Sequence, residues 1–137
     1  MKAVPDSMLW VSYVTHIDGP RHAAIDRAHK QRVRLLTSPY ILDEVERILT
    51  DKFAKPSRYV QLALQKILRL ATEVNLPSSS KRYVPGDPDD DAVIQTALSG
   101  KADVIVTADK VLLKLAKVQD VEIISLETFV LRLPPVE

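Results

Sequence analysis

Short apolar runs alternate along the chain with longer segments whose apolar residues recur at helical spacing. A run that is apolar at every position is typical of a strand buried on both faces of a parallel sheet. Strands that alternate with helices favour an α/β fold with a mainly parallel sheet and right-handed crossovers. The predicted strands cover residues 2–4, 33–36, 103–107 and 121–125. The predicted helices cover residues 7–14, 20–31, 39–53 and 56–71, and three shorter ones begin near Asp89, Lys110 and Leu126.

Two of the predicted helix ends carry residues that suit them. Ser38 followed by Pro39 predicts a capped helix start, because a serine oxygen accepts a bond from a free backbone N–H and proline fits the first turn. Gly100 follows the apolar segment "ALS", where a helix commonly ends at a residue with positive φ. The stretch 77–82 is rich in serine and predicts a connecting loop.

The size and composition of the chain favour an ordinary globular domain. With 137 residues, 46% of them hydrophobic and 27% charged, we expect residues 1–137 to form one domain with its own core. The chain has no cysteine, so any metal must take oxygen or histidine ligands. No stretch has the pattern of a signal peptide or the roughly 20 apolar residues of a membrane span. We therefore expect a soluble, cytoplasmic protein that does not bind a membrane.

The net charge of +1 conceals an uneven distribution. Residues 1–85 hold 14 Lys and Arg against 8 Asp and Glu, whereas residues 86–137 hold 5 against 10. A basic half can attract nucleic acid and an acidic half can hold cations, although two solvated faces that happen to differ explain the numbers equally well.

Four acids are predicted to meet at one edge of the sheet. In an open parallel sheet, ligands bind beyond the carboxyl ends of the strands. Asp6 follows the first predicted strand and Asp109 follows the third, while Glu44 and Asp90 lie on helices whose starting loops can reach the same edge. Neighbouring carboxylates repel one another, so such a cluster needs bound cations or raised pKa values.

Helical spacing separates the members of the acidic run "DPDDDAVIQTA". Asp90 extends an apolar stripe that must face the core, whereas Asp89 and Asp91 are each rotated from it by about 100°. We therefore interpret Asp90 as pointing inward, and Asp89 and Asp91 as capping or solvent-facing acids. The residues that define the stripe are Val93, Ile94, Ala97 and Leu98.

The remaining acids have simpler explanations that the sequence leaves open. Glu44 and Glu46 flank a buried helix stripe on opposite sides, so Glu44 taken alone is better explained as a solvated residue. Asp6 is a stronger functional candidate, because a strand-end acid has few structural duties beyond capping the next helix, and Ser7 is also available for that cap. Asp109 can equally be a turn residue or a helix cap.

Other kinds of chemistry find little support in the chain. The three histidines lack the spacing of a metal site, and there is no P-loop, no G-x-S-x-G and no G-x-G-x-x-G. Trp10 and Tyr13 fit a core or a dimer contact better than a platform for bases. The basic residues from Arg21 to Arg34 spread around their helix and the following strand and form no single stripe.

These acids and their surroundings resemble the PIN-domain family over nearly the whole chain, and in particular its toxin-type (VapC-like) branch. Asp6 sits in "VPDSMLWVS", similar to the family's strand followed by Asp and Ser or Thr, and Glu44 sits in "SPYILDEVERIL", similar to its Ser-to-Glu helix. The block "DPDDDAVIQTALSGKADVIVTADKVLL" resembles its last two motifs and places Asp90 and Asp109 at the third and fourth acids.

The resemblance implies a three-layer α/β/α sandwich and a ribonuclease dependent on Mg²⁺ or Mn²⁺. Asp6, Glu44, Asp90 and Asp109 would be the catalytic acids and metal ligands, since oxygen ligands suit hard divalent ions. RNA would be the substrate, held in part by the basic half of the chain. A cognate antitoxin and a second copy of the chain, in a homodimer, are the implied partners.

One position departs from the family pattern. Where the family commonly has Asn two residues after its first Asp, this chain has Met8, which cannot donate a hydrogen bond. Ser7 and Thr107 would then support the site, or activity is lowered. A phosphatase would need an Asp at position 8 and is disfavoured, whereas a catalytically weak or inactive PIN-like interaction domain stays an alternative. Pro5 is also unusual in a predicted central strand.

Overall fold

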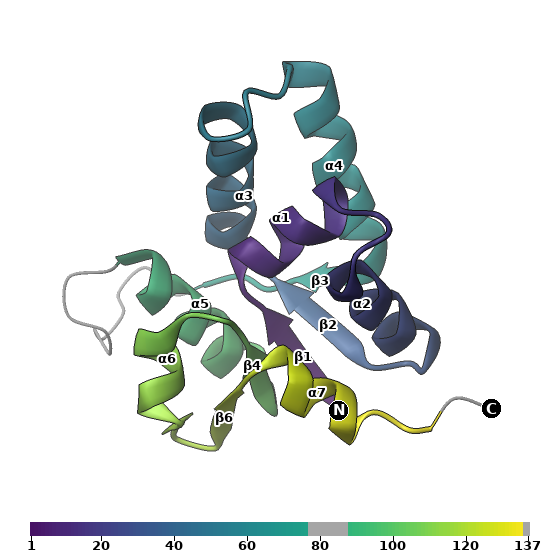
Figure 1. The fold of residues 1–137 in the computed structure, drawn as a ribbon. Helices are drawn as coiled ribbons and strands as arrows, with labels where there is room; N and C mark the ends of the chain where they lie inside the picture. The colour runs from purple at the N-terminus through teal and green to yellow at the C-terminus, as the bar shows by residue number, and fades with distance from the viewer. Residues whose placement is uncertain (77–87, 136–137) are drawn as a thin grey trace.

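The protein is an α/β sandwich built on a mainly parallel sheet of six strands (Figure 1). The computed structural model describes residues 1–76 and 88–135, and for residues 88–91 the backbone only. The strands lie in the order β3-β2-β1-β4-β6-β5, and only the β5–β6 pair is antiparallel. The strands are β1 (Lys2–Pro5), β2 (Arg34–Thr37), β3 (Ala71–Glu73), β4 (Val104–Val106), β5 (Lys117–Val118) and β6 (Val121–Ile124).

Helices cover both faces of the sheet, which confirms the expected three-layer α/β/α sandwich. Right-handed crossovers from β1 to β2 to β3 place α1 to α4 on one face, and the return through β4 to β6 places α5 and α6 on the other. Figure 1 shows α3 and α4 side by side, extending away from the sheet. The helices are α1 (Ser7–Thr15), α2 (Pro20–Lys30), α3 (Pro39–Asp51), α4 (Ser57–Leu70), α5 (Pro88–Ser99), α6 (Lys110–Leu115) and α7 (Leu126–Arg132).

The core forms where the helices press their apolar faces onto the sheet. Strands β1, β2 and β4 are buried at nearly every position, as the apolar runs within them predict. Trp10 is fully buried and Tyr13 nearly so, hence both belong to the core. None of the helices in the described part of the chain has the length and apolar character required to cross a bilayer.

The sequence missed two strands, and one of its backbone expectations was wrong. Strands β3 and β5 lie at the two edges of the sheet and have only three and two residues. Gly100 does not have positive φ; the following Lys101 does, at 53°. Glycine is needed at position 100 for space, because a Cβ there would lie 2.7 Å from a methyl carbon of Leu36 and 3.1 Å from one of Val74.

Pro5 is tolerated in the central strand β1 because of where its nitrogen lies. The backbone N–H of Asp6 donates to the carbonyl of Val106 in β4, so the nitrogen of Pro5, one residue earlier, faces β2. The ladder between β1 and β2 pairs only Lys2 and Ala3 of β1, and it has ended before it reaches Pro5. No ladder hydrogen bond is therefore lost.

The predicted loop 77–82 lies outside the described residues. The helix that begins near Asp89 is α5, but the side chains of Asp89, Asp90 and Asp91 are also outside what is described. The assignment of Asp90 as the inward-facing acid therefore stays a prediction.

Candidate active site

The topology of the sheet defines where a ligand is expected to bind. The chain leaves β1 towards β2 on one side of the sheet, whereas β4 connects onward to β6 on the other side. The crevice between the carboxyl ends of two such neighbouring strands is the usual ligand site of an open α/β sheet. Asp6 follows β1 directly, and residues 107–109 follow β4, so these segments meet at that crevice.

Asp6 is a buried carboxylate held at both oxygens. Its Oδ1 accepts a hydrogen bond of 2.8 Å from the backbone N–H of Leu9, which makes Asp6 the N-cap of α1. Its Oδ2 accepts a hydrogen bond from the hydroxyl of Thr107 in the segment after β4. Only 9% of Asp6 is exposed to solvent. The carboxylate is therefore fixed in orientation before any ligand binds.

Burial raises the pKa of the Asp6 carboxyl above the ordinary value of 3.8. The hydrogen bonds from Thr107 and Leu9 and the positive charge of Arg21 act in the opposite direction, and the negative charge of Asp109 adds to the increase. Burial has the largest effect of these. The ionised form of Asp6 thus lacks full compensation from the protein itself, and a bound cation would stabilise it.

Asp109 takes part in the same hydrogen-bond chain. Its backbone N–H donates to the hydroxyl oxygen of Thr107 at 3.0 Å, so Thr107 connects the two acids. The Oδ1 of Asp109 accepts bonds from the N–H groups of Val111 and Leu112 and caps α6. The capping role that the sequence left open is thus observed, and Asp109 also lines the cavity beside Asp6.

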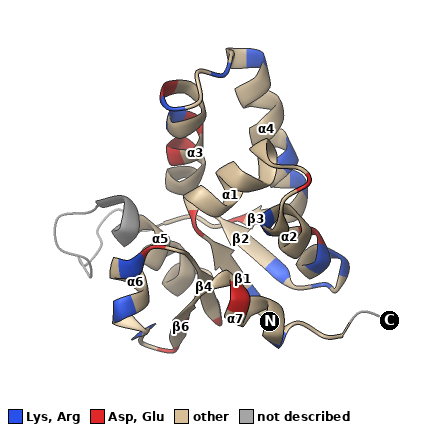
Figure 2. Ribbon diagram, viewed as in Figure 1, with Lys and Arg blue, Asp and Glu red and all other residues tan. Residues whose placement is uncertain are grey.

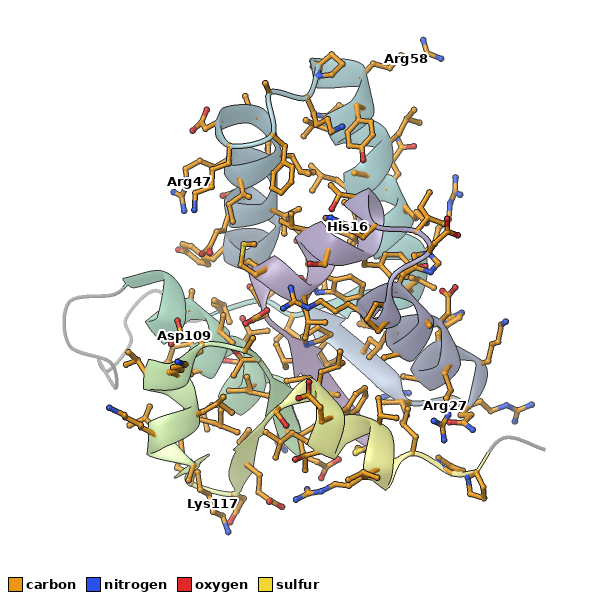
Figure 3. The ribbon with its side chains drawn as sticks, viewed as in Figure 1. His16, Arg27, Arg47, Arg58, Asp109 and Lys117 are labelled. Atoms are coloured by element: carbon orange, nitrogen blue, oxygen red, sulfur yellow. The ribbon has the colours of Figure 1, made fainter. Side chains whose placement is uncertain are left out.

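A cavity of about 320 Å³ brings three of the four expected acids together. Glu44 is half-buried on α3 and lies on its wall with Asp6 and Asp109, whereas Glu46, two residues later, is exposed. Figure 3 shows Asp109 at the start of α6, facing the crevice beside α5. The nine residues that line the cavity are Asp6, Ser7, Met8, Leu9, Arg21, Glu44, Val93, Ala108 and Asp109.

The two residues expected to support the acids, Thr107 and Ser7, differ in their hydrogen bonds. Thr107 is buried and donates its hydroxyl hydrogen to Asp6. Ser7 is also buried and lines the cavity, but its Oγ has no hydrogen-bond partner among the described residues. A buried hydroxyl without a partner is costly, which is consistent with a polar ligand that binds here. Met8 lies on the same wall and is 41% exposed, with no group that can position water.

The donor set of the cavity fits a hard divalent cation. Carboxylate and hydroxyl oxygens are the ligands that Mg²⁺ and Mn²⁺ prefer, and the cavity offers no sulfur donor except the thioether of Met8. Within residues 1–76 and 92–135, however, no three acidic or histidine side chains are close enough to form a metal cage. The carboxylate of Asp90, the fourth expected ligand, lies outside the described side chains.

Sequence reasoning missed one residue of this site. Arg21 of α2 lines the acidic cavity, and its Nη1 donates a hydrogen bond of 2.8 Å to Ser12 of α1. In the sequence Arg21 is one of several scattered basic residues and shows no periodic relation to the acids. Only the packing of α2 against α1 brings it there.

Comparison with known proteins gives the class of protein that this fold and site define. A family model described as the PIN domain matches residues 2–111, and the chain belongs to that family. The chain therefore shares its family with proteins that are generally nucleases. No curated protein sequence matches the chain.

Two solved structures have the same fold. VapBC2 from Rickettsia felis, bound to a DNA fragment from its promoter, matches with a TM-score of 0.68 and 12% identity, over 91% of this chain and 98% of that one. PAE2754 from Pyrobaculum aerophilum matches with a TM-score of 0.64 and 19% identity, over 96% of this chain and 94% of that one. At these identities the likeness concerns the fold.

Proposed function

We propose that this PIN domain is a ribonuclease that hydrolyses phosphodiester bonds of RNA with Mg²⁺ or Mn²⁺, and that residues 1–137 act as one domain. The observation that carries the proposal is the cavity at the switch point of the sheet, where Asp6, Glu44 and Asp109 come together. The negative charge of Asp109 adds to the raised pKa of Asp6, and a cation bound between these carboxylates would relieve that repulsion. Phosphoryl chemistry is the usual purpose of such oxygen-lined divalent sites.

Each acid has a defined part in this proposal. Asp6, Glu44 and Asp109, with Asp90 from the first turn of α5, would hold one or two divalent ions. When bound, such ions would provide a hydroxide nucleophile at neutral pH and would neutralise charge on the attacked phosphate. Thr107 keeps both Asp6 and Asp109 in place through its hydroxyl, as the partners of metal ligands commonly do. The hydroxyl of Ser7, which has no hydrogen-bond partner in the described part of the chain, would position water or substrate.

The toxin-type assignment completes the proposal. It has two supports: the motif resemblance, which points to the VapC-like branch, and the shared fold with VapBC2. We accordingly propose a cognate antitoxin as partner, a homodimer as the assembly, and the cytoplasm as the location. Figure 2 shows Lys and Arg on α2, α4 and α6, so positive charge that could attract RNA is spread over several helices.

A second candidate is a catalytically weak PIN-like interaction domain. Met8 favours it, because its thioether lines the acidic cavity at a position where the family commonly has Asn. A thioether cannot donate a hydrogen bond to a carboxylate or to an attacking water. In this second case metal still binds, but RNA is cleaved slowly or not at all.

Metal-dependent thermal stability tests the site. Binding to the folded state at 100 times the dissociation constant stabilises a protein by about 2.7 kcal/mol, so Mn²⁺ must raise the melting temperature over that in chelator. Asp109→Asn keeps a helix-capping side chain but removes one negative charge from the cavity, and it should lose most of the shift. Asp120→Asn removes the same charge from the exposed turn between β5 and β6, away from the cavity, and should keep the Mn²⁺-dependent shift in melting temperature. Equal shifts for both variants would contradict the site.

A further inference from the structure

We propose that Arg21 is a substrate-positioning residue, whose guanidinium binds a phosphate group of the RNA next to the one that is cleaved. This inference rests on the proposed function and adds to it the path of the RNA strand across the protein. It depends on where Arg21 lies, on how it is held and on the cavity that it shares.

Arg21 stands between two neighbouring cavities. It lines the acidic cavity with Asp6 and Asp109, and it also lines a second cavity of about 270 Å³. The second cavity lies at the end of α1 and the start of α2, and its lining residues are Ser12, His16, Gly19, Pro20 and Arg21. Since Arg21 forms part of both walls, a chain of nucleotides that leaves the acidic cavity on this side must pass its guanidinium.

Helix α1 provides a row of residues along the same path. Met8 and Ser12 lie four residues, or about 6 Å, apart on one face of α1, and His16 is the C-cap residue that follows the last turn of the helix. Met8 lines the acidic cavity, whereas Ser12 and His16 line the second one. The guanidinium of Arg21 is hydrogen-bonded to the middle residue of this row, Ser12. Figure 3 shows His16 at the far end of α1 from the acids, where its exposed ring can contact a base.

Arg21 has the charge that a phosphate requires, and most of its N–H donors have no partner among the described residues. One of its five N–H donors binds the hydroxyl of Ser12 at 2.8 Å, which fixes the guanidinium. Within the described residues it forms no ion pair within 4 Å, although acids line the same cavity. A half-buried guanidinium with free donors is suited to bind phosphate through two parallel hydrogen bonds. Its fixed position lowers the entropy cost of that contact.

Single substitutions of Arg21 test the proposal. The assay is Mn²⁺-dependent cleavage of single-stranded RNA by Arg21→Gln, Arg21→Lys and Lys117→Gln. Lys117 of β5 lies opposite Glu122 of β6 in the strand pairing, near the amino ends of β4 and β6, whereas the acids lie at the carboxyl ends of the strands. Lys117→Gln removes one positive charge, as Arg21→Gln does. Arg21→Gln should lower kcat/KM about 10- to 100-fold, mainly through KM, and reduce the slope of log affinity against log salt by about one. Arg21→Lys should keep the slope and recover part of the activity.

Two further readouts separate this role from a structural one. The Mn²⁺-dependent shift in melting temperature should be at least as large in Arg21→Gln as in wild type, because no metal ligand is changed and a positive charge near Asp6 is removed. If Arg21→Gln and Lys117→Gln have the same KM and the same salt slope while wild type cleaves RNA, the inference is wrong and the proposed function stands. If wild type neither binds nor cleaves RNA with Mn²⁺, the proposed function fails and the inference fails with it.

Discussion

The hydroxyl of Thr107 joins the two acids of the crevice, Asp6 and Asp109, so its removal tests the site geometry directly. Thr107→Val replaces the hydroxyl by a methyl group of similar volume at a residue that is 1% exposed. It removes the bond to the carboxylate of Asp6 and the acceptor for the N–H of Asp109. A hydrogen bond to a charged group contributes about 1.5–3 kcal/mol and a neutral one about 1 kcal/mol.

The free energy of unfolding should fall by about 2 kcal/mol at neutral pH. The two lost bonds together amount to about 2–4 kcal/mol, and the methyl group recovers part of this because it needs no desolvation of a hydroxyl. With a urea m-value of about 2 kcal/mol/M, the unfolding midpoint should drop by about 1 M. The loss should be smaller in acid, where Asp6 is protonated and its bond to Thr107 is no longer assisted by charge.

Thr37→Val is the matched control for this measurement. Thr37 is also fully buried at the end of a central strand, but its hydroxyl has no partner among the described residues. Its replacement by valine should leave the midpoint unchanged or raise it, since an unsatisfied buried hydroxyl is removed. If Thr107→Val and Thr37→Val shift the midpoint equally, or if Thr107→Val is neutral, the proposed orientation of Asp6 by Thr107 is wrong.

Three further predictions concern charge and packing. Asp6 binds its proton more tightly in the folded state, so its contribution to the free energy of unfolding falls as the pH rises from 3.8 through its raised pKa. In the absence of metal, Asp6→Asn should therefore have a higher free energy of unfolding than wild type at neutral pH. Below pH 3.8 the two proteins should have equal free energies of unfolding in urea titrations. Asp90→Asn should abolish RNA cleavage in Mn²⁺, while Asp91→Asn stays within a few-fold of wild type; equal losses would refute the helix-face assignment. Gly100→Ala should lower the free energy of unfolding by about 1–2 kcal/mol in urea melts, because the new Cβ would clash with the side chain of Leu36. A variant more stable than wild type would show that Leu36 can move to make room for the new methyl group.

The sheet was predictable where both of its faces are buried. Strands such as β4 are apolar throughout, which is typical of a strand buried on both faces of a parallel sheet. Strand β3 was missed because its three residues follow α4 directly and only Ala71 is buried, so the sequence continues a helical pattern. Strand β5 has only two residues and pairs at the other edge. Edge strands this short carry too few buried side chains to form a pattern.

The site was predictable only in part, for a related reason. The position of Asp6 after a strand and the flanking position of Glu44 follow from local sequence, and the structure brings both to one cavity with Asp109. Arg21 could not be found this way, because its place depends on how α2 packs on α1. The partner of Thr107 is likewise 101 residues away along the chain. Contacts between distant segments leave no periodic trace in a sequence.

Cleavage of RNA by two matched variants of α3 tests the central claim most directly. Glu44 lines the acidic cavity and Glu46 is exposed on the same helix, so Glu44→Gln and Glu46→Gln remove the same charge two residues apart. With Mn²⁺ and total cellular RNA as substrate, wild type and Glu46→Gln should produce the same cleavage products at similar rates. Glu44→Gln should lose cleavage by at least 100-fold while it still folds, as shown by a cooperative melting transition in chelator. Equal cleavage by the two variants, or cleavage that persists in chelator, would contradict a metal-dependent ribonuclease at this site.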